Sequence, residues 1–149
     1  MIFIAASWKQ RERVRILADR LRKMDFGVYD FTDPHCRKVK EVPPESIAED
    51  FNPEKEKYWD YVNKKEWFAA VEENRINLDA CSMLVLLLPC GMDAMADWAY
   101  VVGQRKPTFL VGNPQKGGKC LVHNWATGWF ADDEQLINFL RIKDRILLF

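Results

Sequence analysis

Short apolar runs alternate along the chain with segments in which apolar residues recur at helical spacing. Residues 2–6 are continuously apolar, which is typical of a strand buried on both faces of a parallel sheet. A polar segment with apolar residues every three or four positions follows and predicts an amphipathic helix. Its apolar positions are Val14, Leu17, Ala18, Leu21 and Met24. Gly27 ends this helix, and residues 28–31 predict a second strand, so the start of the chain indicates a βαβ unit.

The connection over residues 32–58 interrupts this alternation. It contains many charged residues and four prolines, namely Pro34, Pro43, Pro44 and Pro53. Long connections in compact domains often form lids or binding loops, whereas a disordered insertion is the other interpretation of this composition. The sequence leaves both interpretations open.

Helical spacing returns over residues 58–80 and predicts a helix with an apolar stripe. The stripe consists of Trp67, Phe68, Val71, Leu78 and Cys81. Asn74 lies within it, three residues after Val71 and four before Leu78. A polar residue on a core-facing stripe requires a partner. Asn74 is therefore expected either to form a hydrogen bond inside the fold or to face a pocket.

Residues 82–89 give the clearest strand signal, because they are apolar without alternation and so predict a central strand. The turn at Cys90 and Gly91 leads into a predicted helix over 92–103. We expect one face of this helix to pack on the sheet through Met92, Met95, Ala99 and Val102. Asp93, Asp97 and Tyr100 lie on a different face, at spacings of four and three residues.

Three further elements complete the pattern. Residues 108–111 predict a strand, and residues 120–122 predict a short one. Asp132 is expected to cap a last helix, with Gln135 three residues later as in a capping box. The apolar face of that helix would comprise Leu136, Ile137, Phe139, Leu140, Ile146 and Leu147.

Strands that alternate with helices predict an α/β fold with a doubly wound parallel sheet, formed by a single domain over residues 1–149. Right-handed crossovers favour the flavodoxin-like strand order 2-1-3-4-5. In that order the first and third strands are neighbours, and ligands bind at their carboxyl ends, where the chain changes direction. The loops over residues 6–9 and 89–93 should meet at this point.

Asp93 and Asp97 reach this crevice one helical turn apart. Asp93 fits a helix-capping residue, since aspartate is favoured there. Asp97 lies one turn deeper, where the helix N-terminus should favour its ionised form. An ionised carboxylate in a cleft is a candidate nucleophile, and a solvated helix face is the alternative.

Composition and charge exclude several classes of function. Lys plus Arg and Asp plus Glu each number 22, so the net charge of zero gives no argument for a nucleic acid polymer or an anionic membrane. No apolar run approaches membrane-spanning length, and the apolar start is too short for a signal peptide. We therefore expect a cytoplasmic protein. Phosphate-cradling glycine motifs are absent after the first strand, and no metal or cofactor is expected.

The four cysteines, Cys36, Cys81, Cys90 and Cys120, form no C-x-x-C pair and are expected to be reduced thiols. A nucleophilic role for Cys90 in the loop would need a nearby histidine.

The segment over residues 95–107 reads MADWAYVVGQRKP and resembles the signature helix of nucleoside 2-deoxyribosyltransferases and related nucleotide N-glycosidases. The opening FIAAS over residues 3–7 is similar to the first strand and substrate loop of that family, and residues 74–88 are similar to its second motif. The resemblance implies a carboxylate that attacks the anomeric carbon of a deoxyribose, releases the base and forms a covalent intermediate. Water or a second base then resolves the intermediate.

The resemblance implies roles for individual residues. Asp97 aligns with the nucleophilic glutamate, and Asp93 would assist it. Asn74 aligns with an aspartate that orients or protonates the departing base, and Ser7 aligns with a residue near the sugar or phosphate. Trp8 would form a stacking wall, and Lys9 would lie near a phosphate. Gly91 would line the substrate loop.

Several positions depart from the family pattern. Asp97 is one methylene shorter than glutamate, and the amide of Asn74 cannot act as a general acid. Ala6 and Ala99 stand where the family usually has glycine. These departures suit a divergent hydrolase, or a catalytically silent nucleotide-binding module of the same fold.

The sequence therefore leaves open whether the chain is an enzyme. The first hypothesis is an N-glycosidase or deoxyribosyltransferase for a small nucleoside or nucleotide, and the second is the silent binding module. A third is an NAD-cleaving domain of the Toll/interleukin-receptor type, whose catalytic glutamate lies in a comparable helix. The family's members are usually oligomers, so the resemblance also implies a homo-oligomer. Trp125 and Trp129 could supply its contact surface or could equally belong to the core.

Overall fold

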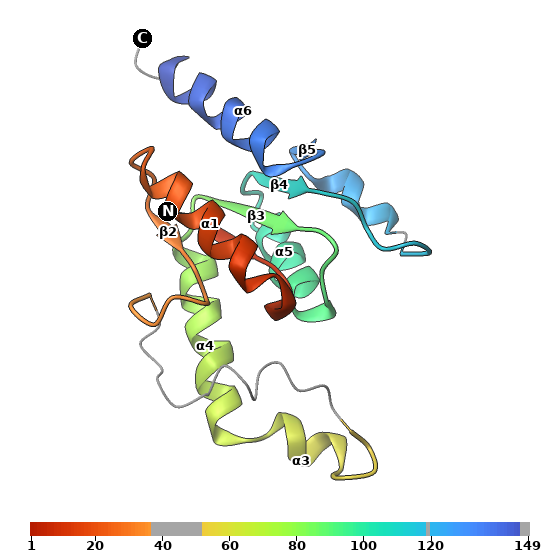
Figure 1. Ribbon diagram of the computed structural model, residues 1–149. Coiled ribbons are helices and arrows are strands. Elements are labelled where there is room, and N and C mark those ends of the chain that lie inside the picture. The colour runs from red at the N-terminus through yellow and green to blue at the C-terminus, as the bar shows by residue number, and fades with distance from the viewer. Residues whose placement is uncertain (37–51, 119, 147–149) are drawn as a thin grey trace.

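The computed structural model describes residues 1–36, 52–118 and 120–146, in which a parallel sheet has helices on both faces (Figure 1). Its elements in chain order are β1 (Ile2–Ala5), the 3-10 helix η1 (Trp8–Gln10), α1 (Arg11–Arg22), β2 (Val28–Tyr29), α3 (Tyr58–Val62), α4 (Lys65–Ala80), β3 (Met83–Leu87), α5 (Met92–Gly103), β4 (Thr108–Val111), the 3-10 helix η2 (Leu121–Trp125), β5 (Gly128–Phe130) and α6 (Asp133–Ile146).

The five strands are all parallel and lie in the order β2-β1-β3-β4-β5. This confirms the predicted flavodoxin-like order. β1 pairs with β3 along its whole length, from Ile2 opposite Met83 to Ala5 opposite Leu86. The carboxyl ends of these two strands therefore lie together, as the position of the predicted crevice requires.

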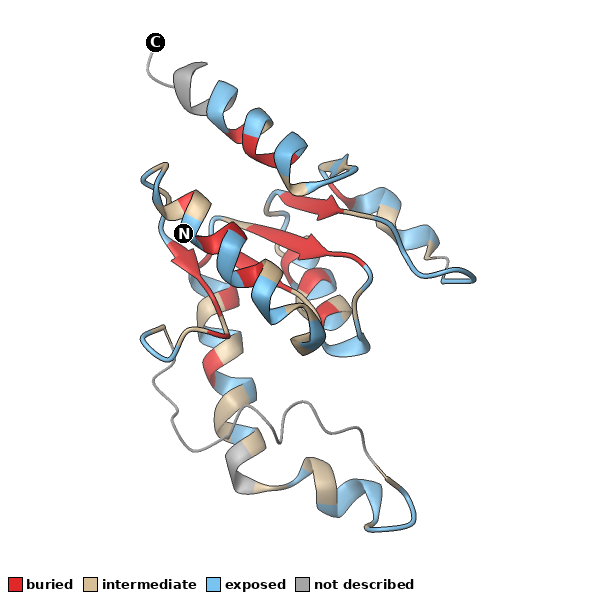
Figure 2. Cartoon of the chain, viewed as in Figure 1, coloured by how far each residue is buried: buried red, intermediate tan, exposed pale blue. Residues whose placement is uncertain are grey.

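Alternate residues of the central strands enter two separate cores. On one face, Ile2 and Ile4 of β1 pack with side chains of α1 and α6. On the other face, Phe3 and Ala5 pack with side chains of α4 and α5. β1 and β4 are buried throughout, which explains their uninterrupted apolar sequences (Figure 2).

The buried positions of α1 and the cap of α6 agree with the predictions, but α1 ends at Arg22 rather than beside Gly27. The side chain of Ile146 and residue Leu147, which the pattern assigns to the apolar face of α6, lie outside the described part of the chain. Four of the predicted apolar positions lie within α1, and all four, Val14, Leu17, Ala18 and Leu21, are buried. At the start of α6, the Asp132 carboxylate accepts a hydrogen bond from the Gln135 backbone N–H at 2.9 Å. The Gln135 side chain in turn accepts one from the Ala131 backbone N–H at 3.0 Å. This reciprocal pair is a close variant of the predicted capping box.

The prediction of one helix over residues 58–80 is wrong in two respects. The chain forms two helices, α3 and α4, separated at Asn63 and Lys64. Phe68 and Val71 of the predicted apolar stripe are 73% and 67% exposed. Figure 1 shows the reason, since α3 and the first turns of α4 extend away from the sheet. Only the later part of α4 meets the core, through residues such as Leu78.

The predicted sheet-facing side of α5 is also wrong. Ala94, Trp98 and Val101 are buried against the sheet, while Met92 is 89% exposed and Ala99 is exposed. Met95 and Val102 are only partly buried. Trp98 is among the largest fully buried side chains, and its size sets the orientation of the helix.

The predicted strand at residues 120–122 does not form. Leu121 and Val122 belong to η2 instead, where they are exposed. The fifth strand is β5, whose three residues lie a few positions later. Residues 37–51 of the long connection lie outside the described residues, so its predicted role as a lid or insertion stays untested.

Candidate functional site

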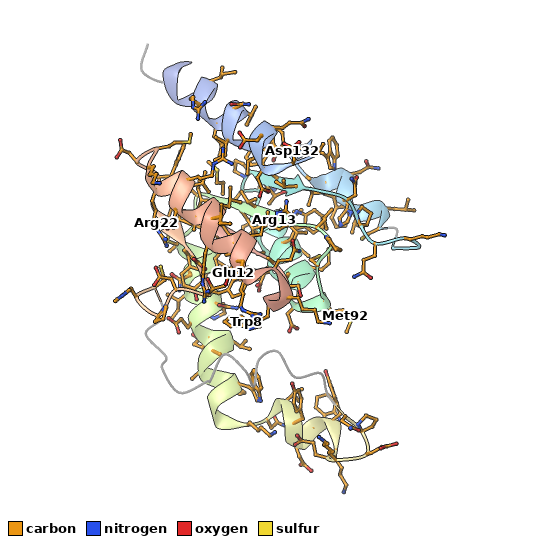
Figure 3. The ribbon with its side chains drawn as sticks, in the orientation of Figure 1. Trp8, Glu12, Arg13, Arg22, Met92 and Asp132 are labelled. Carbon is orange, nitrogen blue, oxygen red and sulfur yellow. The ribbon has the colours of Figure 1, made fainter. Side chains whose placement is uncertain are left out.

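The two loops expected at the crevice meet through Gln10. Its side-chain amide donates hydrogen bonds to the carbonyl oxygens of Leu87, at 3.3 Å, and Pro89, at 2.6 Å. η1, which follows β1, is thereby held against the connection between β3 and α5. Figure 3 shows Trp8 of η1 and Met92 of α5 at the same end of the molecule.

Arg13 extends this contact to a third element. One guanidinium nitrogen donates to the Gln10 side-chain oxygen at 2.9 Å and to the Leu88 carbonyl oxygen at 3.1 Å. The other nitrogens hold the Asp133 carboxylate, with the shortest separation at 2.6 Å. A single side chain therefore connects α1, the loop after β3 and the start of α6. No sequence pattern indicates this role, because arginines on an amphipathic helix usually face solvent.

Asp97 lies on the face of α5 that points toward α4. Further along that face, the Tyr100 hydroxyl donates to the Asp79 carboxylate of α4 at 2.8 Å. The Gln104 side-chain amide donates to the same carboxylate oxygen at 2.7 Å. Asp93 precedes Asp97 by one turn on this face. Both aspartates therefore lie on the α4 side of α5, in its N-terminal half near the carboxyl edge of the sheet.

Burial leaves the Asp97 carboxyl group in an unfavourable environment. Its side chain is partly buried, and within the described residues it has no hydrogen-bonding partner. Burial, followed by repulsion from the Asp93 carboxylate, raises the pKa of Asp97 to about 7. Burial and this repulsion therefore oppose the ionised form, which the helix N-terminus favours. Such a displaced pKa is characteristic of functional carboxyl groups.

Asp93 itself is exposed in the first turn of α5. It does not cap the helix, since the N-cap position is Gly91 and no side chain caps it. A Cβ atom added to Gly91 would meet no atom within 4 Å, so the loop is open at this point. The contribution of Asp93 is electrostatic, through its effect on Asp97.

Asn74 forms a hydrogen bond inside the fold. Its side-chain oxygen accepts from the Tyr29 hydroxyl at 3.2 Å, and the Tyr29 ring stacks on Phe3 at 4.9 Å between centroids. This bond fixes the orientation of the amide and leaves the Nδ2 hydrogens available. The first alternative, a hydrogen bond inside the fold, is therefore confirmed, and a pocket at the partly exposed Asn74 stays a prediction.

The residues after β1 form the outer part of the site. The Ser7 hydroxyl accepts from the Lys9 backbone N–H at 3.3 Å and so caps η1. Trp8 is partly buried, with its ring 5.6 Å from that of Phe31, and the Lys9 side chain is exposed. Within the described residues, no hydrogen bond joins Ser7 or Asn74 to an aspartate of α5. The candidate residues share one edge of the sheet without forming a closed network.

The loop cysteine is not in an activating environment. Burial raises the pKa of the Cys90 thiol, and the nearby Cys120 thiol acts in the same direction. A raised pKa reduces the thiolate fraction that nucleophilic attack requires. In the parts of the chain that the structure describes, no group of three or more potential metal ligands occurs.

Comparison with known proteins gives no match to a family model, a curated protein or a solved structure. Among the described helices, none combines the length and apolar character needed to cross a membrane.

Replacing Asp97 with asparagine should stabilise the protein increasingly as the pH rises. The folded-state pKa of about 7 lies above the ordinary value of 3.8, so the native protein holds this proton more tightly than the unfolded chain. Native stability is therefore lost between about pH 4 and pH 7, by roughly 4 kcal/mol at most. Urea unfolding of both proteins from pH 4 to pH 8 should show that the free energy of unfolding of the variant rises relative to that of the wild type across this window. A pH-independent difference would contradict the account.

Replacing Arg13 with lysine should destabilise the protein by about 1–2 kcal/mol, because an ammonium group cannot hold the Asp133 carboxylate and two further oxygens together. Arg15→Lys is the matched control on the same helix, since among the described residues Arg15 pairs only with exposed Glu12, at 2.8 Å. It should change stability by less than about 0.5 kcal/mol. If both variants lost the same free energy of unfolding, the Arg13 contacts would contribute no more to stability than an exposed ion pair does.

Proposed function

We propose that the chain cleaves the N-glycosidic bond of a nucleoside or nucleotide, with Asp97 as the nucleophile. The observation that carries the proposal is the partly buried Asp97 carboxyl group, which has no hydrogen-bonding partner among the described residues and lies near the carboxyl edge of a doubly wound sheet. Ligands bind at this edge in open α/β sheets. A carboxyl group held there at a cost in stability is better explained by chemistry than by packing.

In the proposed reaction, a carboxylate oxygen of Asp97 attacks the anomeric carbon while the bond from that carbon to the base nitrogen breaks. The bonding electrons leave with the base, which takes up a proton. Water, or a second base, then attacks the same carbon and releases Asp97. The transition state resembles an oxocarbenium ion, whose positive charge a poorly solvated carboxylate stabilises strongly.

Neighbouring residues would hold the substrate. The Asn74 amide, oriented by Tyr29, can donate a hydrogen bond to the base. Trp8 would contact a planar ring, and Ser7 would lie near the sugar. Exposed Lys9 would attract a substrate phosphate. The open loop at Gly91 would allow close approach of the substrate to α5.

A nucleotide-binding module without catalysis is the second candidate. One observation favours it: the group aligned with the family's proton donor is the amide of Asn74, and its oxygen is already occupied by Tyr29. An amide can hold a base but cannot protonate it. Formation of a homo-oligomer and a cytoplasmic location remain predictions attached to either candidate.

Free-base release from deoxynucleosides, ribonucleosides, their monophosphates and NAD is the test. The wild type should release base from at least one of them, and Asp97→Asn should lower the rate by about 100-fold or more. Because attack requires the carboxylate, the rate should increase with pH through about 7. Asp93→Asn should shift this rise to lower pH, since it removes the repulsion that raises the pKa of Asp97.

Asp19→Asn, at an exposed position of α1, provides the control and should leave both rate and pH profile unchanged. Absence of base release from every compound, combined with a higher melting temperature in the presence of a nucleotide, would replace the enzyme with the binding module. Release that persists in Asp97→Asn would remove Asp97 from the reaction.

A further inference from the structure

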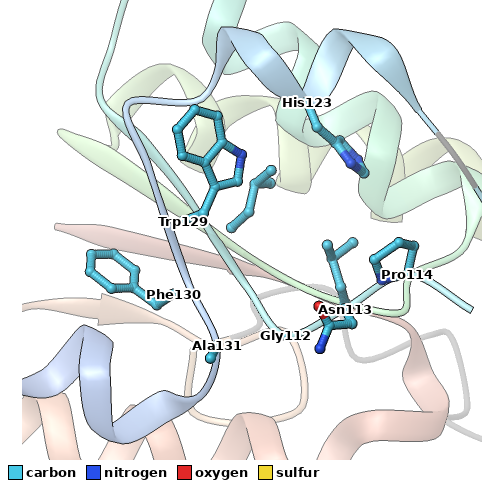
Figure 4. A pocket seen from close by; sticks show the side chains of 9 residues that line it. Gly112, Asn113, Pro114, His123, Trp129, Phe130 and Ala131 are labelled. Atoms are coloured by element: carbon cyan, nitrogen blue, oxygen red, sulfur yellow. The ribbon is translucent and has the colours of Figure 1, made fainter.

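A pocket of about 280 Å³ lies at the carboxyl ends of β3, β4 and β5, beside η2 (Figure 4). It is lined by Leu88, Leu110, Gly112, Asn113, Pro114, His123, Trp129, Phe130 and Ala131. Figure 4 shows His123 and Asn113 projecting from different segments of the wall, with Trp129 on the β5 side. Gly112 has a positive φ of 95°, and a Cβ there would approach the Leu88 carbonyl oxygen to 2.8 Å. Glycine at position 112 therefore allows the loop after β4 to approach the loop after β3 closely.

This pocket is separate from the Asp97 site. The His123 ring stands edge-on to buried Trp98 of α5, with centroids 5.7 Å apart and planes at 86°. Asp97, by contrast, lies on the side of α5 that faces α4, as the contacts of Tyr100 with Asp79 show. The two regions therefore flank α5 on different sides.

The lining selects against a charged ligand. None of its side chains is acidic or permanently basic, and burial lowers the pKa of His123, which keeps the imidazole neutral at pH 7. A phosphate or carboxylate would lose its hydration here without gaining an opposite charge. The ligand that suits this pocket is uncharged.

Three groups in the pocket are available to a ligand. Nε2 of His123 is buried and has no hydrogen-bond partner in the described residues, which is costly for a polar atom unless something occupies the site. The Asn113 amide is exposed and forms no hydrogen bond within the described chain. The Trp129 indole is 58% exposed and offers an apolar face. Together they suit a flat ring with polar atoms on its edge.

We propose that this pocket binds an uncharged, planar nitrogen heterocycle of the size of a free nucleobase. The Asn113 amide would pair with a donor and an acceptor on one edge of the ring. His123 would bond a second polar atom, and Trp129 would stack on the ring face. The volume is at the lower end for small-molecule sites, which favours the ring without its sugar and phosphate. The inference does not depend on the proposed cleavage reaction.

Isothermal titration calorimetry with adenine as the probe tests the proposal. The wild type should bind adenine, and Trp129→Ala should weaken binding by at least about fivefold through loss of stacking. His123→Phe keeps a ring against Trp98 but removes Nε2, and it should also weaken binding several-fold. Both variants should fold, because Trp129 is largely exposed and phenylalanine retains the ring contact.

Trp125→Ala is the matched control, since Trp125 is 64% exposed in adjacent η2 and does not line the pocket. It should leave adenine affinity unchanged. The proposal is overturned if adenine does not bind at millimolar concentration, or if both pocket variants bind adenine as tightly as the wild type does.

Discussion

The parallel pairing of β1 with β3 is the interaction on which the rest of the structure depends. β1 is buried on both faces and pairs with β3 along its length, so these two strands form the centre of the sheet. α1 then covers one face and α5 the other. Their N-terminal ends both lie at the carboxyl edge of the sheet, and Gln10 joins the loops at 2.6 Å and 3.3 Å. The candidate residues after β1 and β3 reach this edge through the same arrangement, whereas Asn74 comes from α4.

Asp79 of α4 and Asp97 of α5 differ in their hydrogen bonds and in the direction of their pKa shifts. Asp79 of α4 accepts hydrogen bonds from Tyr100 and Gln104, which lower its pKa. Asp97, on the same face of α5 as these donors, has no such bond in the part of the chain that the structure describes, and burial raises its pKa to about 7. Donors that could satisfy a carboxylate are thus present nearby but serve Asp79. Native proteins keep such unfavourable groups mainly where function requires them, which is the basis of the proposed role of Asp97.

The sheet could be predicted from the sequence because its central strands are buried and continuously apolar, as residues 2–5 and 83–87 illustrate. β5 could not, since it has only three residues and exposes Trp129, whereas Leu121 and Val122 imitate a strand within η2. The apolar spacing of α5 predicts the wrong buried side, because the volume of Trp98, rather than the spacing of methionines, decides which side packs on the sheet.

The position of the candidate site followed from topology alone, but its energetics did not. The contacts of Gln10 and Arg13 join residues more than 70 positions apart, and no local pattern indicates them. The same is true of the pKa of Asp97, because sequence shows the helix N-terminus but not the degree of burial. Topology therefore located the carboxylates, while tertiary packing determines their burial and their pKa values.

Mass spectrometry of the acid-quenched protein tests the central claim most directly. The wild type, mixed with a deoxynucleoside or deoxynucleotide that it cleaves, should carry one added sugar residue on the peptide that contains Asp97. Asp97→Asn should carry none. An adduct on another residue, or turnover with no adduct under conditions where the intermediate accumulates, would contradict the assignment of Asp97 as the nucleophile.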